Sequence, residues 1–274
     1  MTERVETSLS TDDDYIIFQA GLKRLSGVDL AYYKRRQMER RTRTFALRQG
    51  VEGDLTEYLA LLKRDPEQLE LFLDRMTINV SQLWRNPEHF RTLENKILPE
   101  LAKSVRHGQP LQVWSAGCSY GAEAYTLGAI FLEYRDLFSR PPKIIGSDID
   151  PRMIERAREG WFSADDARTA SPHMLTKYFE KTDGGWRANE QLRRLVNFKV
   201  ENLFEAEVSE LDLILCRNVA IYFTGDARTE LHQIFSDALN PGGFLMIGAT
   251  EVVASPRDVG LDRAFPFSYR RVDR

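Results

Sequence analysis

Apolar residues recur at helical spacing through about the first hundred residues of this chain. Phe18, Leu22 and Leu25 stand at i, i+4 and i+7 behind Thr11 and three aspartates, a pattern typical of a capped amphipathic helix. The same criteria predict further helices from Asp29 toward Gly50, from Asp54 to Lys63, from Pro66 to about Ile78, and from Pro87 to about Val105. The N-terminal part is therefore predicted to be all-helical.

After about residue 105 the apolar positions form short runs separated by helical stretches. These runs predict five strands: Leu111–Ser115, Lys143–Ser147, Val196–Val200, Leu211–Cys216 and Gly243–Gly248. Strands that alternate with helices are typical of a mostly parallel sheet covered on both faces. The predicted fold class is α/β, with an N-terminal all-α domain ahead of a Rossmann-like sheet domain.

The length of 274 residues fits about two domains. We expect a helical domain at 1–85, a linker helix at 86–106 and a sheet domain at 107–274. Near 160–195 the alternation of strands and helices is interrupted by aromatic pairs and a Gly-Gly turn, which indicates a small inserted subdomain.

Charge and apolar content narrow the possible classes of protein. Lys and Arg number 38 against 41 Asp and Glu, so the chain does not have the charge of a protein covered with nucleic-acid contacts. Three aspartates precede the first apolar run, and no stretch has the 18 or more apolar residues of a membrane span. Two cysteines are too few for disulfide bonds to hold together a fold of this length. We expect a cytoplasmic protein without membrane insertion and without a metal site.

The residues that follow the first two predicted strands indicate a nucleoside ligand, because ligands of such sheets bind beyond the carboxyl ends of the strands. Gly117 and Gly121 flank a turn that opens a helix, but the spacing fits neither the dinucleotide fingerprint nor a P-loop. Asp148 ends the second strand, where a carboxylate accepts hydrogen bonds from ribose. Asp150 is the better cap for the helix opened by Pro151, which leaves Asp148 available to a ligand. A nucleoside without a phosphate cradle points to S-adenosylmethionine.

Four segments resemble the chemotaxis receptor methyltransferase family, CheR. They read Asp74-Arg-Met-Thr-Ile-Asn-Val-Ser-Gln-Leu-Trp-Arg85, Trp114-Ser-Ala-Gly-Cys-Ser-Tyr-Gly-Ala-Glu-Ala-Tyr-Thr126, Gly146-Ser-Asp-Ile-Asp150 and Cys216-Arg-Asn-Val-Ala-Ile-Tyr-Phe223. The resemblance implies a class I methyltransferase sheet. It also implies transfer of a methyl group from S-adenosylmethionine to glutamate carboxylates on chemoreceptor helices, in sensory adaptation. The product would be S-adenosylhomocysteine.

The resemblance also implies roles for individual residues. Arg85 and Tyr222 correspond to the pair nearest the transferred methyl, and whether Arg85 acts on substrate, cofactor or both is left open. The cofactor-binding positions implied are Asn79, Ser81, Arg85, Gly117, Glu123, Asp148, Asn202, Leu203, Arg217 and Asn218.

A basic stripe on the second predicted helix indicates the partner surface. Arg36, Arg40 and Arg43 stand at i, i+4 and i+7, so they share one helix face. On a net acidic chain this stripe favours docking to an acidic chemoreceptor helix bundle. The stretch between Phe179 and Phe198 is a few residues shorter than in family members that capture a receptor's C-terminal peptide, so we expect no such tether. We also expect a monomer.

Two other functions compete with this one. The first is a non-catalytic S-adenosylmethionine-binding signalling adaptor, which retained Arg85 and Tyr222 disfavour. The second is a nucleic-acid methyltransferase. Such an enzyme would bind the base amine with an Asn/Asp-Pro-Pro-aromatic segment, but this chain has Arg217-Asn-Val-Ala at that place. The sequence also shows no aromatic-rich basic arm.

Overall fold

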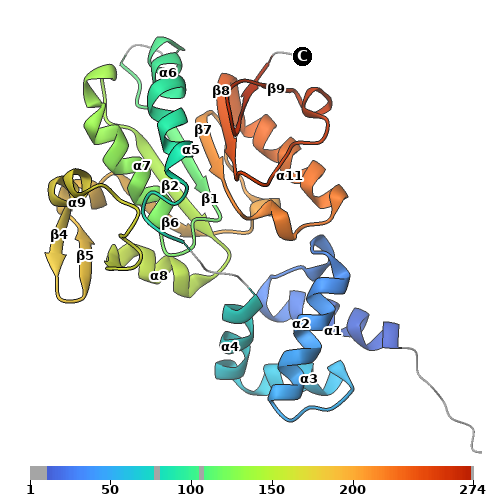
Figure 1. Cartoon of the computed structure of the whole chain (residues 1–274). Coiled ribbons are helices and arrows are strands. Elements are labelled where there is room, and N and C mark those ends of the chain that lie inside the picture. Colours follow the sequence, from blue (N-terminus) through green and yellow to red (C-terminus); the bar gives the residue numbers. More distant parts are fainter. Residues whose placement is uncertain (1–10, 77–80, 105–107, 273–274) are drawn as a thin grey trace, which may run out of the picture. The chain divides into compact units, whose positions relative to one another are not determined.

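The computed structural model describes residues 11–76, 81–104 and 108–272. The chain divides into two compact units, one made of residues 1–78 with 222–224 and the other of 79–221 with 225–274 (Figure 1). The expected domain limits at residues 85 and 106 stay a prediction. Within the described residues, no helix combines the length and the apolar character that crossing a membrane requires.

The helical unit packs four α-helices around an aromatic core. The rings of Phe18 and Tyr58 are stacked with centroids 6.0 Å apart, and Phe72 meets each of them edge-on at 5.6 Å. All three side chains are buried, so they hold the helices together from the inside. The helices are α1 (Thr11–Ser26), α2 (Arg35–Arg48), α3 (Leu55–Arg64) and α4 (Pro66–Met76).

The prediction that the second helix starts at Asp29 is wrong. Asp29 accepts a hydrogen bond from the N–H of Ala31 at 2.9 Å and caps only the short turn η1 (Leu30–Tyr32). Tyr33 is extended and pairs with Phe223 in an antiparallel bridge, with the two rings 4.9 Å apart. Because this bridge uses backbone groups that a continuous helix would need for itself, α2 begins only at Arg35.

The sheet unit is built on seven strands in the order β6-β2-β1-β7-β8-β10-β9. The first five of these are parallel, whereas β10 runs antiparallel to both β8 and β9. The strands are β1 (Gln112–Ala116), β2 (Lys143–Asp148), β6 (Val196–Val200), β7 (Leu211–Cys216), β8 (Leu239–Ile247), β9 (Leu261–Arg263) and β10 (Ser268–Arg271). All five predicted strands are therefore confirmed, and the sequence missed β9 and β10.

Helices connect the parallel strands, as the alternating pattern predicted. Helix α7 (Ala122–Glu133) follows β1, α8 (Pro151–Glu159) follows β2 and α11 (Gly225–Ala238) precedes β8. The remaining helical segments are α5 (Pro87–Thr92), the π-helical Leu93–Ile97, α6 (Leu98–Ser104), α9 (Pro172–Tyr178), α10 (Glu190–Arg193), η3 (Arg135–Leu137), η4 (Leu203–Glu205), η5 (Ala220–Tyr222) and η6 (Pro256–Val259).

A second, three-stranded sheet lies in the stretch where an inserted subdomain was expected. Its antiparallel strands β3 (Trp161–Ser163), β5 (Gly185–Ala188) and β4 (Phe179–Thr182) stand in the order β3-β5-β4. A Cβ at Gly185 would come within 2.1 Å of the carbonyl oxygen of Phe162, so only glycine allows the central strand to approach β3 this closely.

Candidate cofactor site

The glycine loop after β1 packs directly onto the loop after β7. Gly117 has φ +75°, and the N–H groups of Gly117 and Cys118 donate to the carbonyl oxygen of Ser147 at 2.8 and 2.9 Å. A Cβ at Gly117 would lie 2.6 Å from Cγ2 of Val219. Glycine is thus required here both by the backbone conformation and by the close approach of the two loops.

Asp148 is buried at the end of β2 and fastens the glycine loop from its other side. Its Oδ2 accepts from the N–H of Ser119 at 2.8 Å, and its Oδ1 accepts from the N–H of Asp150 at 3.0 Å. Burial raises the pKa of the Asp148 carboxyl, and these N–H groups oppose the shift. Asp150 caps α8 by accepting from the N–H of Arg152, which confirms the predicted cap. Asp148 is therefore not left to a ligand alone, because it also holds the backbone of the loop.

Glu123 and Arg217 form a buried ion pair below the same edge of the sheet. Arg217 Nη1 lies 3.2 Å from Glu123 Oε2, and the two side chains are only 3% and 13% exposed, respectively. The hydroxyl of Ser115 donates to Glu123 Oε1 at 2.8 Å, and the guanidinium of Arg217 lies 4.9 Å from the centre of the Phe90 ring. Burial raises the pKa of Glu123 and lowers that of Arg217, while each charge opposes the shift of the other.

The segment 81–86 is held on the sheet unit by hydrogen bonds from several elements. The N–H of Trp84 donates to Thr126 Oγ1 at 3.1 Å, the Tyr120 hydroxyl to the carbonyl oxygen of Ser81, and Arg217 to the carbonyl oxygen of Arg85. Trp84 and Asn86 have φ values of 53° and 58°, in the left-handed region. Such values persist in non-glycine residues only where surrounding contacts fix the backbone.

The other predicted site residues have more local surroundings. The Asn202 side chain caps η4 by accepting from the N–H of Phe204 at 3.2 Å, and Leu203 is buried. Asn79 lies outside the described residues. Arg85 belongs to the sheet unit and Tyr222 to the helical unit, so the predicted pairing of these two side chains stays a prediction.

Sequence reasoning missed Glu251, which lies just beyond the end of β8. Its carboxylate accepts from the N–H groups of Gly248, Asn218 and Ile221 at 2.6, 3.0 and 3.2 Å. The rule that residues after each parallel strand carry chemistry would have found it, because Ala249-Thr-Glu251 directly follows the fifth predicted strand, Gly243–Gly248.

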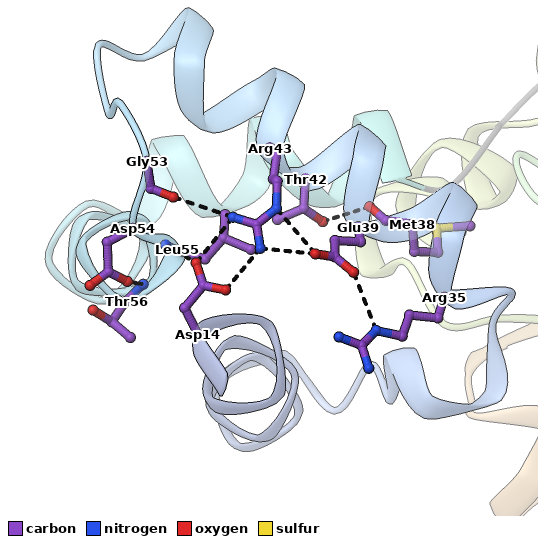
Figure 2. A network of polar contacts seen from close by, with 10 residues as sticks. All are labelled: Asp14, Arg35, Met38, Glu39, Thr42, Arg43, Gly53, Asp54, Leu55 and Thr56. Atoms are coloured by element: carbon purple, nitrogen blue, oxygen red, sulfur yellow. Dashed lines mark hydrogen bonds and ion pairs between the residues drawn. The ribbon is translucent and has the colours of Figure 1, made fainter. Parts of the chain in front are cut away.

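The predicted basic stripe on α2 divides into two kinds of residue. Figure 2 shows the Arg43 guanidinium turned toward Asp14 of α1 and Glu39 of its own helix, with closest contacts of 2.8 Å to each. Arg43 also donates to the carbonyl oxygen of Gly53 at 3.2 Å. Arg36 and Arg40 are exposed. The part of the stripe available to a partner is therefore narrower than the sequence suggested.

In the part of the chain that the structure describes, no three His, Cys, Asp or Glu side chains are grouped so as to hold a metal ion. The functional groups at the carboxyl edge of the sheet are instead a glycine loop, the buried Asp148 and the Glu123–Arg217 pair. Together with the sheet order, they define an S-adenosylmethionine-dependent methyltransferase of class I.

Two family models identify the protein more closely. The model described as "CheR methyltransferase, SAM binding domain", where SAM is S-adenosylmethionine, matches residues 79–261, and "CheR methyltransferase, all-alpha domain" matches residues 13–77. The chain belongs to the CheR methyltransferase family. The cofactor of this family's sheet domain is S-adenosylmethionine, as the sequence predicted.

Named relatives are similar over nearly the whole chain. The chemotaxis protein methyltransferase of Listeria monocytogenes is 34% identical over 259 residues, which cover 94% of this chain and 97% of the relative. Chemotaxis protein methyltransferase 2 of Pseudomonas aeruginosa is 32% identical, covering 88% of this chain and 87% of the relative. Among solved structures, a TehB-like SAM-dependent methyltransferase from Corynebacterium glutamicum is 17% identical with a TM-score of 0.36, and the match covers 68% of this chain and 93% of that chain.

Proposed function

We propose that this protein methylates glutamate side chains of chemoreceptor cytoplasmic helices and so produces the glutamate methyl esters of sensory adaptation. The observation that carries the proposal is the match of both CheR family models, in order, over residues 13–77 and 79–261. Relatives named chemotaxis protein methyltransferase support it, as do Arg85 and Tyr222 at the positions implied for the reaction.

The residues at the carboxyl edge of the sheet fit S-adenosylmethionine. The carboxylate of Asp148 has lone pairs besides those that accept from the N–H groups of Ser119 and Asp150, and they would accept hydrogen bonds from the ribose hydroxyls. Asn202 and Leu203 would lie against adenine, and Gly117, Arg217 and Asn218 would contact the rest of the cofactor. Within the pair, Glu123 neutralises Arg217 and holds it beside the segment 81–86. The bound cofactor supplies an electrophilic methyl group on a sulfonium centre.

A glutamate acceptor suits a site without a general base. Its ordinary pKa of about 4.3 leaves roughly 99% or more of it ionised at neutral pH, so the nucleophile needs no deprotonation. The protein then has to exclude water and align the carboxylate with the methyl group. The Tyr222 hydroxyl would orient one carboxylate oxygen by donating a hydrogen bond. Arg85 would steady the substrate carboxylate, the cofactor's own carboxylate, or both.

The proposed reaction is tested by incubating the protein with labelled S-adenosylmethionine and a panel of chemoreceptor cytoplasmic fragments. We expect base-labile methyl incorporation, because glutamate methyl esters hydrolyse in alkali. Tyr222→Phe should lower turnover by about tenfold or more while binding S-adenosylhomocysteine normally, and Asp148→Ala should mainly weaken binding. A protein that binds the cofactor but labels no receptor fragment would favour the adaptor function. Equal loss of cofactor affinity in both variants would contradict the assigned roles.

We propose that the acidic receptor bundle docks on the exposed part of the basic stripe, at Arg36 and Arg40 of α2. Docking without a C-terminal tether peptide, and a monomeric state, remain part of this proposal.

Reversing the charge of Arg36 and Arg40 together should lower kcat/KM for receptor methylation by about tenfold, because rim charges act mainly on association. Affinity for S-adenosylhomocysteine should not change. Lys63→Glu with Arg64→Glu is the matched control, since it makes the same charge change at exposed positions of α3 in the same unit. An equal loss in this control would mean that net charge, and not the α2 surface, governs docking.

A further inference from the structure

The carboxylate of Glu251 joins the end of β8 to both ends of the loop that follows β7. Its Oε2 accepts from the N–H of Gly248 at 2.6 Å and of Asn218 at 3.0 Å, while its Oε1 accepts from the N–H of Ile221 at 3.2 Å. The residue is 9% exposed, so these bonds are made with little competition from water. Three backbone N–H groups that donate to one carboxylate form a strong anchor.

The backbone held by this anchor is in an unfavourable conformation. Asn218 has φ +62°, in the left-handed region that disfavours residues with a side chain, although asparagine tolerates it better than most. The next residue, Val219, packs against Gly117 of the loop after β1. Without its anchor, the loop at 217–221 would relax toward an ordinary conformation and move Arg217 and Asn218 with it.

Both the residue type at 251 and the glycine at 248 are matched to this arrangement. Glutamine in place of Glu251 would offer an NH₂ group to a backbone N–H, because only one of its two terminal atoms can accept. A Cβ at Gly248 would come within 2.6 Å of Glu251 Oε2 and 3.0 Å of the nitrogen of Asn218. Alanine at 248 would therefore push the carboxylate out of the position that it occupies now.

We infer that Glu251 is a positioning residue for cofactor binding, which holds the loop 217–221 so that Arg217 and Asn218 face S-adenosylmethionine. This inference rests on the proposed assignment of Arg217 and Asn218 as cofactor contacts, and it is independent of which substrate receives the methyl group. Glu251 acts through the loop and does not touch the reacting atoms.

The test uses the full chain and measures calorimetric affinity for S-adenosylhomocysteine together with hydrogen exchange of the loop amides. Glu251→Gln and Gly248→Ala should each weaken binding by about tenfold or more. Both should also speed exchange at the N–H groups of Asn218 and Ile221 without a matching change along β7 and β8. The two variants alter the two partners of the same contact. If both give the same result, misfolding of one variant does not explain it.

A matched control is Asp212, whose carboxylate accepts from the N–H of Gln112 at 2.8 Å and from the amide of Asn240 at 2.9 Å, at the other end of β7. Asp212→Asn should keep its affinity within about twofold of the wild type even where it lowers stability. An Asp212→Asn loss as large as that of Glu251→Gln would show a general structural effect and overturn the inference.

Asn218→Gly separates this inference from the assignment on which it rests, because glycine removes the side chain and still allows the φ of +62°. Wild-type affinity in Glu251→Gln, beside weakened binding in Asn218→Gly, would overturn the role of Glu251 alone. Wild-type affinity in Asn218→Gly would instead contradict the cofactor contact of Asn218 and remove the basis of the inference with it.

Discussion

Arg217→Met is expected to abolish measurable cofactor binding and to lower the free energy of unfolding by about 3–5 kcal/mol. The loss of stability follows from Glu123, which would stay in a site where its side chain is only 13% exposed, without the cation that now lies 3.2 Å away. Methionine keeps an apolar contact with Phe90, so the effect reports the missing charge more than a cavity. Denaturant unfolding and calorimetry with S-adenosylhomocysteine measure the two losses.

The double variant Glu123→Gln with Arg217→Met separates the effect of an unpaired Glu123 charge from the effect of losing the Arg217 side chain. Because neither charge remains, the double variant should recover part of the stability that Arg217→Met loses. It should not recover cofactor affinity, since Arg217 is still absent. Equal stability of the single and double variants at pH 8 would contradict the view that an unpaired Glu123 carboxylate causes the loss.

The difference in stability between Arg217→Met and the double variant should depend on pH in one direction. Burial raises the pKa of Glu123 in the folded protein, and loss of Arg217 removes a charge that opposes the rise. The penalty for an unpaired Glu123 is therefore present at pH values above its folded pKa, where the folded state must hold a buried carboxylate. It shrinks as the pH falls toward the unfolded value of about 4.3, because the folded protein then takes up a proton first. The difference between the single and double variants should narrow accordingly.

The sequence predicted the parallel strands well because each contains a short cluster of apolar residues, as in Leu211–Cys216, where every residue except Asp212 is buried. It missed Leu261–Arg263 and Ser268–Arg271 because these strands are three and four residues long and mostly polar. They join the sheet through backbone pairing with β8 and with each other, which leaves little trace in the side-chain pattern.

Errors at the level of single residues arose where a distant partner decides the outcome. Asp29 has the side chain of a helix cap, but the pairing of Tyr33 with Phe223 ends the turn that Asp29 opens. The second role of Asp148, holding Ser119, depends on a loop 29 positions earlier in the chain. Helical spacing likewise placed Arg43 on one face of α2 without showing that Asp14 of α1 faces it.

Arg43→Met should lower the free energy of unfolding of the helical unit by about 2–3 kcal/mol. Arg43 donates to both carboxylate oxygens of Asp14, at 3.0 and 2.8 Å, and to Glu39 Oε1, so its removal leaves two carboxylates facing each other (Figure 2). The value is set below that of a fully buried pair because Arg43 is 28% exposed and Asp14 18%. Hydrogen exchange of the amides in α1, α2 and α3 of the full chain measures it.

Arg40→Met is the matched control, because it makes the same substitution at an exposed position of the same helix, and it should cost less than about 0.5 kcal/mol. Arg43→Lys should fall between the two, since lysine keeps the charge but cannot bond both oxygens of Asp14 in parallel. A loss in Arg40→Met equal to that in Arg43→Met would show that the two arginines act only through net charge.

Asp14 gives the same contact a pH dependence. Its hydrogen bond with Arg43 lowers its pKa in the folded protein, so the stabilisation is present above the unfolded value of about 3.9 and is lost as the pH falls toward the folded pKa. The helical unit should therefore lose protection against exchange below about pH 4. Asp14→Asn should be less stable at pH 7 but lose less on acidification, whereas an unchanged acid sensitivity would place the titrating group elsewhere. Since Asp14 also accepts from the N–H of Leu55 at 3.1 Å, its protonation loosens α3 together with α1 and α2.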